Sequence, residues 1–215
     1  LFAVRVRVGA VAGRCRPGGA SVVRRRAGGG ARGAGCGRPG GVALTRASPV
    51  PHTGAMVSAS RTPMAENGIN FCPGGGPKRD EAAGEAMGAR LGEPWDRPTG
   101  ADVGRVTRLD DAAARYAAHL LAVLPHRLEG LHVVIDAAHG AASHVSPKVF
   151  RSAGAFVTVI GATPTGLNIN DGYGSTHLAR LQRTVVEQQA HLGIAHDADA
   201  DRSLPVDERG NVVDG

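Results

Sequence analysis

Three aspartates at alternate positions, followed by an arginine, form the stretch DADADR at residues 197–202. In an extended backbone, side chains two residues apart point the same way and lie roughly 6–7 Å apart. The carboxylates of Asp197, Asp199 and Asp201 would therefore repel one another unless a positive charge is bound among them. Divalent cations such as Mg²⁺ bind carboxylate oxygens and often bridge to phosphate, and Arg202 could hold phosphate oxygens. The spacing predicts a divalent-metal site for phosphoryl chemistry.

Two other interpretations compete for this stretch. It could be a solvated acidic loop without a ligand, and this alternative stays open. It also resembles a calcium-binding EF-hand loop, because acids fall at positions 1, 3 and 5 counted from Asp197 and Glu208 falls at position 12. However, position 6 of an EF-hand requires glycine and is Arg202 here, position 9 is Pro205, and the flanks have the pattern of strands instead of helices. The EF-hand is therefore rejected.

The pattern around the aspartates predicts an α/β fold with a mixed, largely parallel sheet flanked by helices. Strands that alternate with helices are typical of such sheets, and ligands bind there beyond the carboxyl ends of the strands. The aspartates directly follow a strand, which favours a functional role. We expect strands over 131–137, 155–161 and 191–197, a loop and helix over 139–154 that ends at Gly154, a helix over 175–189 capped by Ser175, and a hairpin with its turn at 208–211.

Upstream of this region the pattern is weaker. Residues 55–71 are expected to form two short strands joined by a polar loop that contains Pro63. Further elements are expected as a helix over 78–91, a linker over 93–106, and a helix over 110–124 with acids at its start and Pro125 after its end.

The net charge of +6 averages two unlike parts of the chain. Residues 1–65 hold eleven arginines and no acid, whereas residues 66–215 hold 14 basic and 19 acidic residues. A basic arm that binds nucleic acid is one interpretation of the first part. However, its arginines are not interleaved with aromatic residues, because Phe2 is the only aromatic residue in it. We expect residues 1–54 to be a disordered basic segment, or the product of a GC-rich gene read in another frame.

Cysteine content and hydropathy favour a cytoplasmic protein without a membrane segment. The three cysteines are far apart and odd in number, so they fit neither a disulfide framework nor a zinc site with close cysteine pairs. The chain has no run of about 18 apolar residues, which excludes a transmembrane helix of ordinary length.

Four segments resemble the α-D-phosphohexomutase family. The stretch DADADR at 197–202 is similar to its metal loop D-G-D-A-D-R, and SASRTPMAENGINF at 58–71 is similar to its phosphoserine loop S-A-S-H-N-P-x-x-x-N-G-I-K-F. Residues 166–177, GLNINDGYGSTH, resemble the N-I-N-x-x-x-G-S-x-H stretch of the branch that acts on glucosamine phosphates, and VVIDAAHGAAS at 133–143 is also similar. The resemblance covers residues 55–215.

The resemblance implies a domain organisation. Residues 55–109 would be a remnant of phosphohexomutase domain I that carries the phosphoserine loop, and residues 110–215 would be domain II with the metal loop. Domains III and IV, which carry the family's sugar-selecting and phosphate-holding loops, are not found in the sequence. The expectation is a truncated chain.

The resemblance also implies an activity, the interconversion of glucosamine 6-phosphate and glucosamine 1-phosphate for cell-wall precursors. Ser60 maps to the serine that carries the phosphoryl group, and Asp197, Asp199 and Asp201 map to the Mg²⁺ ligands, with a phosphate oxygen on Ser60 beside them. Arg202 maps to the arginine next to the metal and would bind phosphate. The partner would be a sugar phosphate.

The chain departs from the family pattern at several positions that bear on chemistry. Arg61 and Thr62 replace a His-Asn pair, Asn70 replaces a lysine that could act as general acid or base, and Ala198 replaces a glycine where a left-handed turn would be strained. We therefore expect impaired or absent mutase activity. The alternatives are a non-catalytic metal-binding remnant and, further behind, a basic nucleic-acid-binding protein.

Overall fold

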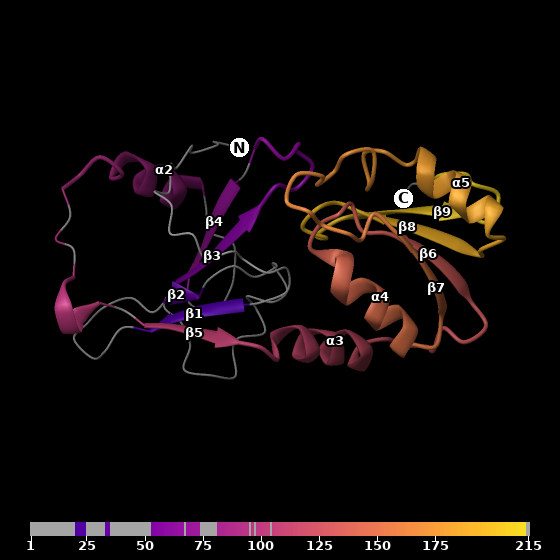
Figure 1. Ribbon diagram of the computed structural model, residues 1–215, viewed down its shortest axis with the longest axis horizontal. Coiled ribbons are helices and arrows are strands. Elements are labelled where there is room, and N and C mark those ends of the chain that lie inside the picture. Colours follow the sequence, from indigo (N-terminus) through magenta and orange to yellow (C-terminus); the bar gives the residue numbers. More distant parts are fainter. Residues whose placement is uncertain are drawn as a thin grey trace. The chain divides into compact units, whose positions relative to one another are not determined.

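The computed structural model describes residues 20–24, 33–34, 53–66, 68–73, 81–94, 96, 98–103 and 105–213 (Figure 1). The chain divides into two compact units, which are described separately. The first unit comprises Leu1–Val57 and Gly68–Ala112, and the second comprises Ser58–Asn67 and Ala113–Gly215. The segment Ser58–Asn67, hereafter the serine loop, therefore belongs with the aspartates of the second unit.

The described part of the first unit contains a five-stranded sheet with the strand order β4-β3-β2-β1-β5. The two short strands expected within 55–71 are confirmed, whereas the linker expected over 93–106 is wrong in part, because a short helical turn and the start of a strand lie in it. Of the segment expected to be disordered, 1–54, the structure describes two strands and the start of a third. The elements are β1 (Ala20–Arg24), β2 (Gly33–Ala34), β3 (Thr53–Ser58), β4 (Gly68–Pro73), α2 (Glu81–Ala89), η2 (Gly100–Asp102) and β5 (Arg105–Leu109).

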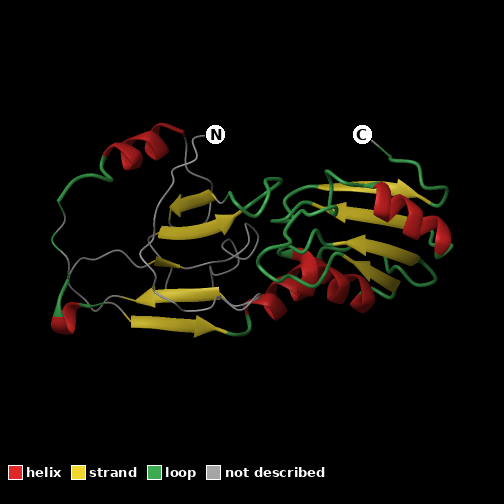
Figure 2. Cartoon of the chain, turned by 45° about the horizontal axis from the view of Figure 1, so that its top comes forward, coloured by secondary structure: helices red, strands yellow, loops and turns green. Residues whose placement is uncertain are grey.

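The second unit has the mixed, largely parallel sheet that the sequence predicts (Figure 2). Its strand order is β7-β6-β8-β9; β6 pairs in parallel with β7 and β8, and β9 pairs antiparallel to β8. Helices α4 and α5 cover opposite faces of this sheet. The elements are α3 (Ala112–Ala122), β6 (His132–Asp136), α4 (Ala142–Ser152), β7 (Phe156–Ile160), α5 (Ala179–Glu187), β8 (Leu192–His196) and β9 (Ser203–Asp207).

The apolar run of β6 is buried on both faces of the sheet. Val134 packs with Leu181 and Val185 of α5, whereas Val133 and Ile135 lie in a second cluster on the other face. Successive side chains of a strand point to opposite faces, so a strand covered by helices on both sides needs apolar residues without alternation. The central strand therefore holds two hydrophobic layers together and fixes where its carboxyl end lies.

The prediction that Ser175 caps a helix is wrong. Helix α5 begins at Ala179, after Leu178. The backbone N–H of Ser175 instead donates to the carbonyl oxygen of His196 at 3.0 Å, which ties this loop to the end of β8. A contact between distant segments thus overrides the local capping preference. The end of α4 is as expected, because Gly154 follows it with φ of 107°.

The outer edge of β9 is covered by the chain that follows it. The N–H of Val213 donates to the carbonyl oxygen of Pro205 at 3.0 Å, and the N–H of Asp207 donates to the carbonyl oxygen of Asn211 at 2.9 Å. The turn at 208–211 is as expected, and its carboxylate Asp207 accepts the N–H of Asn211 at 2.7 Å. These bonds occupy the side of β9 that faces away from β8.

We predict that Leu181→Ala destabilises the second unit by about 2–5 kcal/mol, since Leu181 is fully buried on α5 and its truncation leaves a cavity. Val186→Ala on the same helix is the control, because Val186 is half exposed, and its cost should stay within about 0.5 kcal/mol. Urea unfolding followed by circular dichroism measures both variants. Equal losses in the two would contradict this account of the core.

Candidate metal centre

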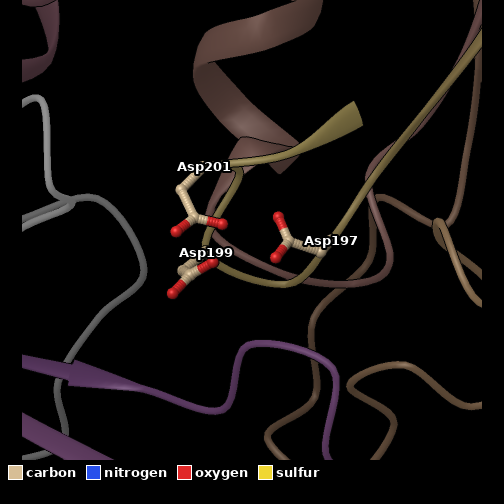
Figure 3. A group of neighbouring side chains, drawn as sticks. All are labelled: Asp197, Asp199 and Asp201. Carbon is tan, nitrogen blue, oxygen red and sulfur yellow. The ribbon is translucent and has the colours of Figure 1, made fainter. Parts of the chain in front are cut away.

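The three aspartates lie in the connection between β8 and β9, at the carboxyl end of the parallel strands (Figure 3). Asp197 closes this connection, because its backbone and side chain both bond across the loop. Its N–H donates to the carbonyl oxygen of Arg202 at 3.3 Å, and the N–H of Arg202 donates to the Asp197 Oδ1 atom at 3.2 Å. Residues 197–202, hereafter the carboxylate loop, are therefore curled instead of extended.

The curled loop gathers the three carboxylates. One oxygen from each of Asp197, Asp199 and Asp201 lies within 4.8 Å of the others, closer than extended spacing would give. Asp197 and Asp199 are buried, with 1% and 9% of their surface exposed, and Asp201 is exposed. The structure brings together all three residues predicted as metal ligands, with Asp201 on the side that solvent reaches.

Two buried oxygens in this group have no hydrogen-bond donor, Oδ2 of Asp197 and Oδ1 of Asp199. A buried polar atom without a partner is costly, and a buried carboxylate oxygen more so. Hard oxygen donors of this kind are what Mg²⁺ and similar cations bind. The residues present therefore fit a divalent cation.

The pKa of Asp197 is raised to about 6: burial is the largest cause, the neighbouring carboxylates of Asp199 and Asp201 act in the same direction, and the N–H of Arg202 opposes them. The free carboxylate loop is thus strained electrostatically at neutral pH. A bound cation would favour the ionised form and so reverse this effect.

The serine loop lies directly on the carboxylate loop. The N–H of Ala198 donates to the carbonyl oxygen of Ser60 at 3.0 Å, and the hydroxyl of Ser58 donates to the Asp199 Oδ2 atom. The N–H of Ser60 in turn donates to the Ser58 Oγ atom at 3.1 Å. Ser60, the predicted phosphoryl carrier, is therefore brought to the carboxylates through its backbone.

Ser58 is a site residue that the sequence analysis missed, although it is the serine whose hydroxyl contacts a carboxylate. A signal was present, because Ser58 and Ser60 are two residues apart and such residues point the same way in an extended segment. The resemblance directed attention to Ser60 alone. In the structure Ser60 has φ of 46°, which turns the chain at that residue.

A close backbone approach holds the carboxylate loop against the loop after β6. A Cβ atom on Gly140 would lie 2.2 Å from the carbonyl oxygen of Ala198, so only glycine fits there. The N–H of Ala141 donates to the same oxygen at 2.7 Å. The prediction of a strained left-handed backbone at Ala198 is wrong. The left-handed residue of this loop is Ala200, with φ of 58°.

Arg202 lies on the outer side of the carboxylate loop. Its side chain is 60% exposed and its Nε atom is 3.8 Å from an oxygen of Asp201. The guanidinium therefore does not enter the buried part of the carboxylate group. Phosphate binding by Arg202 stays a prediction.

Asp136, at the end of β6, is fully buried but serves a different purpose. Its two carboxylate oxygens accept the N–H groups of Ala138 at 2.9 Å and Gly174 at 2.8 Å. Burial raises its pKa, and these two backbone donors oppose the rise. Asp136 thus joins the loop after β6 to the loop before α5, as a structural residue.

The basic segment on which the nucleic-acid alternative rests falls almost entirely outside the described residues. Among the described helices, none combines the length and the apolar character that crossing a membrane requires.

Comparison with known proteins identifies relatives of this chain. The family model of phosphoglucomutase/phosphomannomutase, alpha/beta/alpha domain II, matches residues 114–210. A phosphoglucosamine mutase from Renibacterium salmoninarum is 60% identical over 162 residues, covering 75% of this chain and 36% of that protein. One from Streptomyces coelicolor is 55% identical over 167 residues, covering 75% and 37%. The chain thus spans little more than a third of the length of these relatives.

Solved structures show the same fold. A putative phosphomannomutase from Thermus thermophilus has a TM-score of 0.63 at 22% identity, covering 81% of this chain and 40% of that one. A phosphoglucomutase/phosphomannomutase family protein from Burkholderia thailandensis has a TM-score of 0.60 at 20% identity, covering 75% and 34%. At these identities the likeness supports the fold and no finer property.

We predict that the metal-free chain loses stability as the pH rises from about 4 to about 6. The folded-state pKa of Asp197, about 6, lies above its ordinary value of 3.8. Between these values the folded state keeps a proton that the unfolded state has lost, so folding is disfavoured as the pH rises. Asp197→Asn removes this contribution and should stabilise the metal-free chain at pH 7 by about 2–3 kcal/mol.

Urea unfolding in a chelator at several pH values measures this difference between wild type and Asp197→Asn. The exposed Asp171→Asn, which removes a carboxylate outside the loop, is the control and should follow the wild type. If wild type and Asp197→Asn show the same dependence on pH, the carboxylate of Asp197 does not carry the effect.

Proposed function

We propose that the chain is part of a Mg²⁺-dependent, phosphoserine-based sugar-phosphate mutase of the phosphoglucomutase/phosphomannomutase family, whose domain II model matches residues 114–210. One observation carries the proposal: two buried carboxylate oxygens without donors lie directly beneath a loop with two serines. A cation site next to a hydroxyl that can carry phosphate is what phosphoryl transfer requires.

Asp197, Asp199 and Asp201 would hold the metal, and a phosphate oxygen on Ser60 would complete its ligands. When bound, Mg²⁺ would neutralise negative charge on the phosphoryl group that is being transferred. Arg202 adds a guanidinium at the solvent side of the loop, where it could bind oxygens of a phosphate that enters from solvent. Ser58 holds one carboxylate oxygen of Asp199, so that this side chain keeps a single orientation.

The reaction that we propose moves a phosphoryl group between Ser60 and the sugar. The bond from phosphorus to the Ser60 Oγ atom breaks while a bond to a free hydroxyl of the sugar monophosphate forms; the proton of that hydroxyl leaves to a base, and the Ser60 oxygen takes up a proton. The sugar then carries two phosphates. In the second half, the Ser60 hydroxyl loses its proton and takes the other phosphoryl group, the sugar oxygen that is released takes up a proton, and the remaining sugar monophosphate is the isomer.

Glucosamine 6-phosphate and glucosamine 1-phosphate are the proposed substrates. The support is the name of the relatives that are 55–60% identical, phosphoglucosamine mutase. A cytoplasmic location is part of this proposal, and it rests on the three well-separated cysteines.

A metal-binding domain with little turnover is the second candidate function. The observation that favours it is Asn70, which stands where the resemblance implies a lysine for proton transfer. Asparagine exchanges no proton at neutral pH, and loss of such assistance costs a factor of ~10²–10⁴ in rate. Turnover of glucosamine 6-phosphate at an ordinary rate would contradict this second candidate.

We predict that Mn²⁺ and Mg²⁺ bind the chain at the carboxylate loop and that Asp199→Asn weakens binding at least about tenfold, since even residues outside the ligand shell contribute ~10–100-fold. Isothermal titration calorimetry measures the affinities, with Asp171→Asn as the charge-matched control that should bind like wild type. Equal affinity in Asp199→Asn and wild type would remove the carboxylate loop as the metal site.

We also predict that the chain accepts a phosphoryl group on Ser60 from glucosamine 1,6-bisphosphate in the presence of Mg²⁺. Mass spectrometry locates the phosphate, which Ser60→Ala should abolish and Ser152→Ala, on an exposed helix end, should preserve. Phosphate on Ser58 in place of Ser60 would reassign the carrier, and no phosphate on either serine of a metal-bound chain would contradict the mutase proposal.

A further inference from the structure

Asn170 occupies a buried position in the loop between β7 and α5, where only 7% of its surface is exposed. Its backbone is left-handed, with φ of 59°. Asparagine tolerates this conformation better than most residues that carry a side chain. A buried amide in such a backbone has to find hydrogen-bond partners, because leaving it without them is costly.

The partners of the Asn170 side chain are both on the serine loop. Its Nδ2 atom donates to the carbonyl oxygen of Ser60 at 3.0 Å and to that of Thr62 at 2.8 Å. A side-chain amide has two N–H groups, and each carbonyl can take one of them. Both acceptors are carbonyls, so the amide nitrogen must be the atom that faces the serine loop.

The backbone of Asn170 bonds in the other direction. Its N–H donates to the carbonyl oxygen of Ala138 at 3.0 Å. The loop that contains Ala138 reaches the carboxylate loop through the bond from Ala141 to Ala198, and Ala198 donates to Ser60. These bonds close a ring that runs from Asn170 through the loop after β6 and the carboxylate loop to Ser60, and back to Asn170.

Among the described residues of the serine loop after Ser58, the hydrogen bonds within the loop form local turns. The N–H and the hydroxyl of Thr62 both donate to the carbonyl oxygen of Ala59, and the N–H of Glu66 donates to that of Pro63. Residues 61–66 are exposed. The position of this loop over the carboxylates therefore depends on bonds from the rest of the unit.

We propose that Asn170 is a positioning residue that holds the serine loop over the carboxylate loop, so that Ser60 is presented to the bound metal. The proposal rests on the proposed function for the identity of the metal and of the phosphoryl carrier. The hydrogen bonds that carry it are independent of both. Asn170 contacts neither metal nor phosphate and acts through the backbone of Ser60 and Thr62.

The first test is hydrogen–deuterium exchange of the whole chain without metal. Two variants probe the amide: Asn170→Gly keeps the left-handed backbone accessible and deletes both donors, and Asn170→Asp keeps the shape but places an acceptor against two carbonyls. The matched control is Asn168→Gly, because Asn168 lies two residues away and its amide bonds to Thr163 and Thr165 of its own loop.

We expect exchange in the peptide at 58–66 to become about 5- to 150-fold faster in both Asn170 variants, the factor for two lost hydrogen bonds of ordinary net strength. Peptides from β6 and β8 should keep the wild-type rate, and Asn168→Gly should leave 58–66 unchanged. The proposal is overturned if 58–66 does not respond. It is also overturned if 58–66 and the central strands respond equally, because Asn170 then supports only the general stability of the unit.

The second test adds Mn²⁺, which broadens the NMR signals of nearby amides. In wild type we expect broadening of amides in both the carboxylate loop and the serine loop. In Asn170→Gly broadening should persist at 197–202 and decrease at 58–66. Unchanged broadening at 58–66 would count against positioning. Absence of broadening everywhere, together with selective exchange at 58–66, would reject the proposed metal function and leave the loop contact standing.

Discussion

The burial of like charges at the end of β8 is the constraint on which the second unit depends. Asp197 and Asp199 are both buried, and one carboxylate oxygen of each has no hydrogen-bond donor. The other oxygen of each accepts a hydrogen bond from a neutral group, the backbone N–H of Arg202 for Asp197 and the hydroxyl of Ser58 for Asp199. The guanidinium of Arg202 stays outside. The fold therefore stores an unfavourable electrostatic energy, which a cation would relieve, and the two apolar layers around β6 must offset it.

Backbone strain gathers at the same place. Ser60, Ala138, His139, Asn170 and Ala200 all have positive φ, and all lie in the four loops that meet at the carboxylates. Left-handed backbone costs roughly 1–2 kcal/mol for a residue with a side chain. The chain uses alanine, serine and histidine at some of these positions, where glycine would be free of this cost. Electrostatic and conformational strain are thus concentrated in one corner of a well-packed unit.

Much of this architecture could be predicted from the sequence, because it follows from local patterns. The apolar run of β6, the alternation of strands and helices, and Gly154 after α4 are signals that short stretches carry by themselves. The sequence also predicted that the three aspartates lie close together, since they come directly after a strand. Their arrangement in a curled loop did not, because it depends on a bond between Asp197 and Arg202 that no spacing reveals.

What could not be predicted depends on contacts between distant segments. Ser175 has the right type for a helix cap, but its N–H is taken by the end of β8. Asn170 is an ordinary loop residue in the sequence, and its role appears only when the serine loop, over a hundred residues earlier, lies against it. The contact of Ser58 with Asp199 is of the same kind. Such pairings are properties of the tertiary structure alone.

The covered edge of β9 has a consequence for how this sheet meets other proteins. Pro205 has no N–H, and the backbone groups of Pro205 and Asp207 on that side are already bonded to residues 210–213. An incoming strand would find neither donors nor acceptors free at these two residues, so the sheet is protected there against the edge-to-edge growth that leads to aggregation. The three aspartates lie at the other end of β9, in its connection to β8, so the strand that carries the carboxylate loop is also the strand whose outer edge is covered.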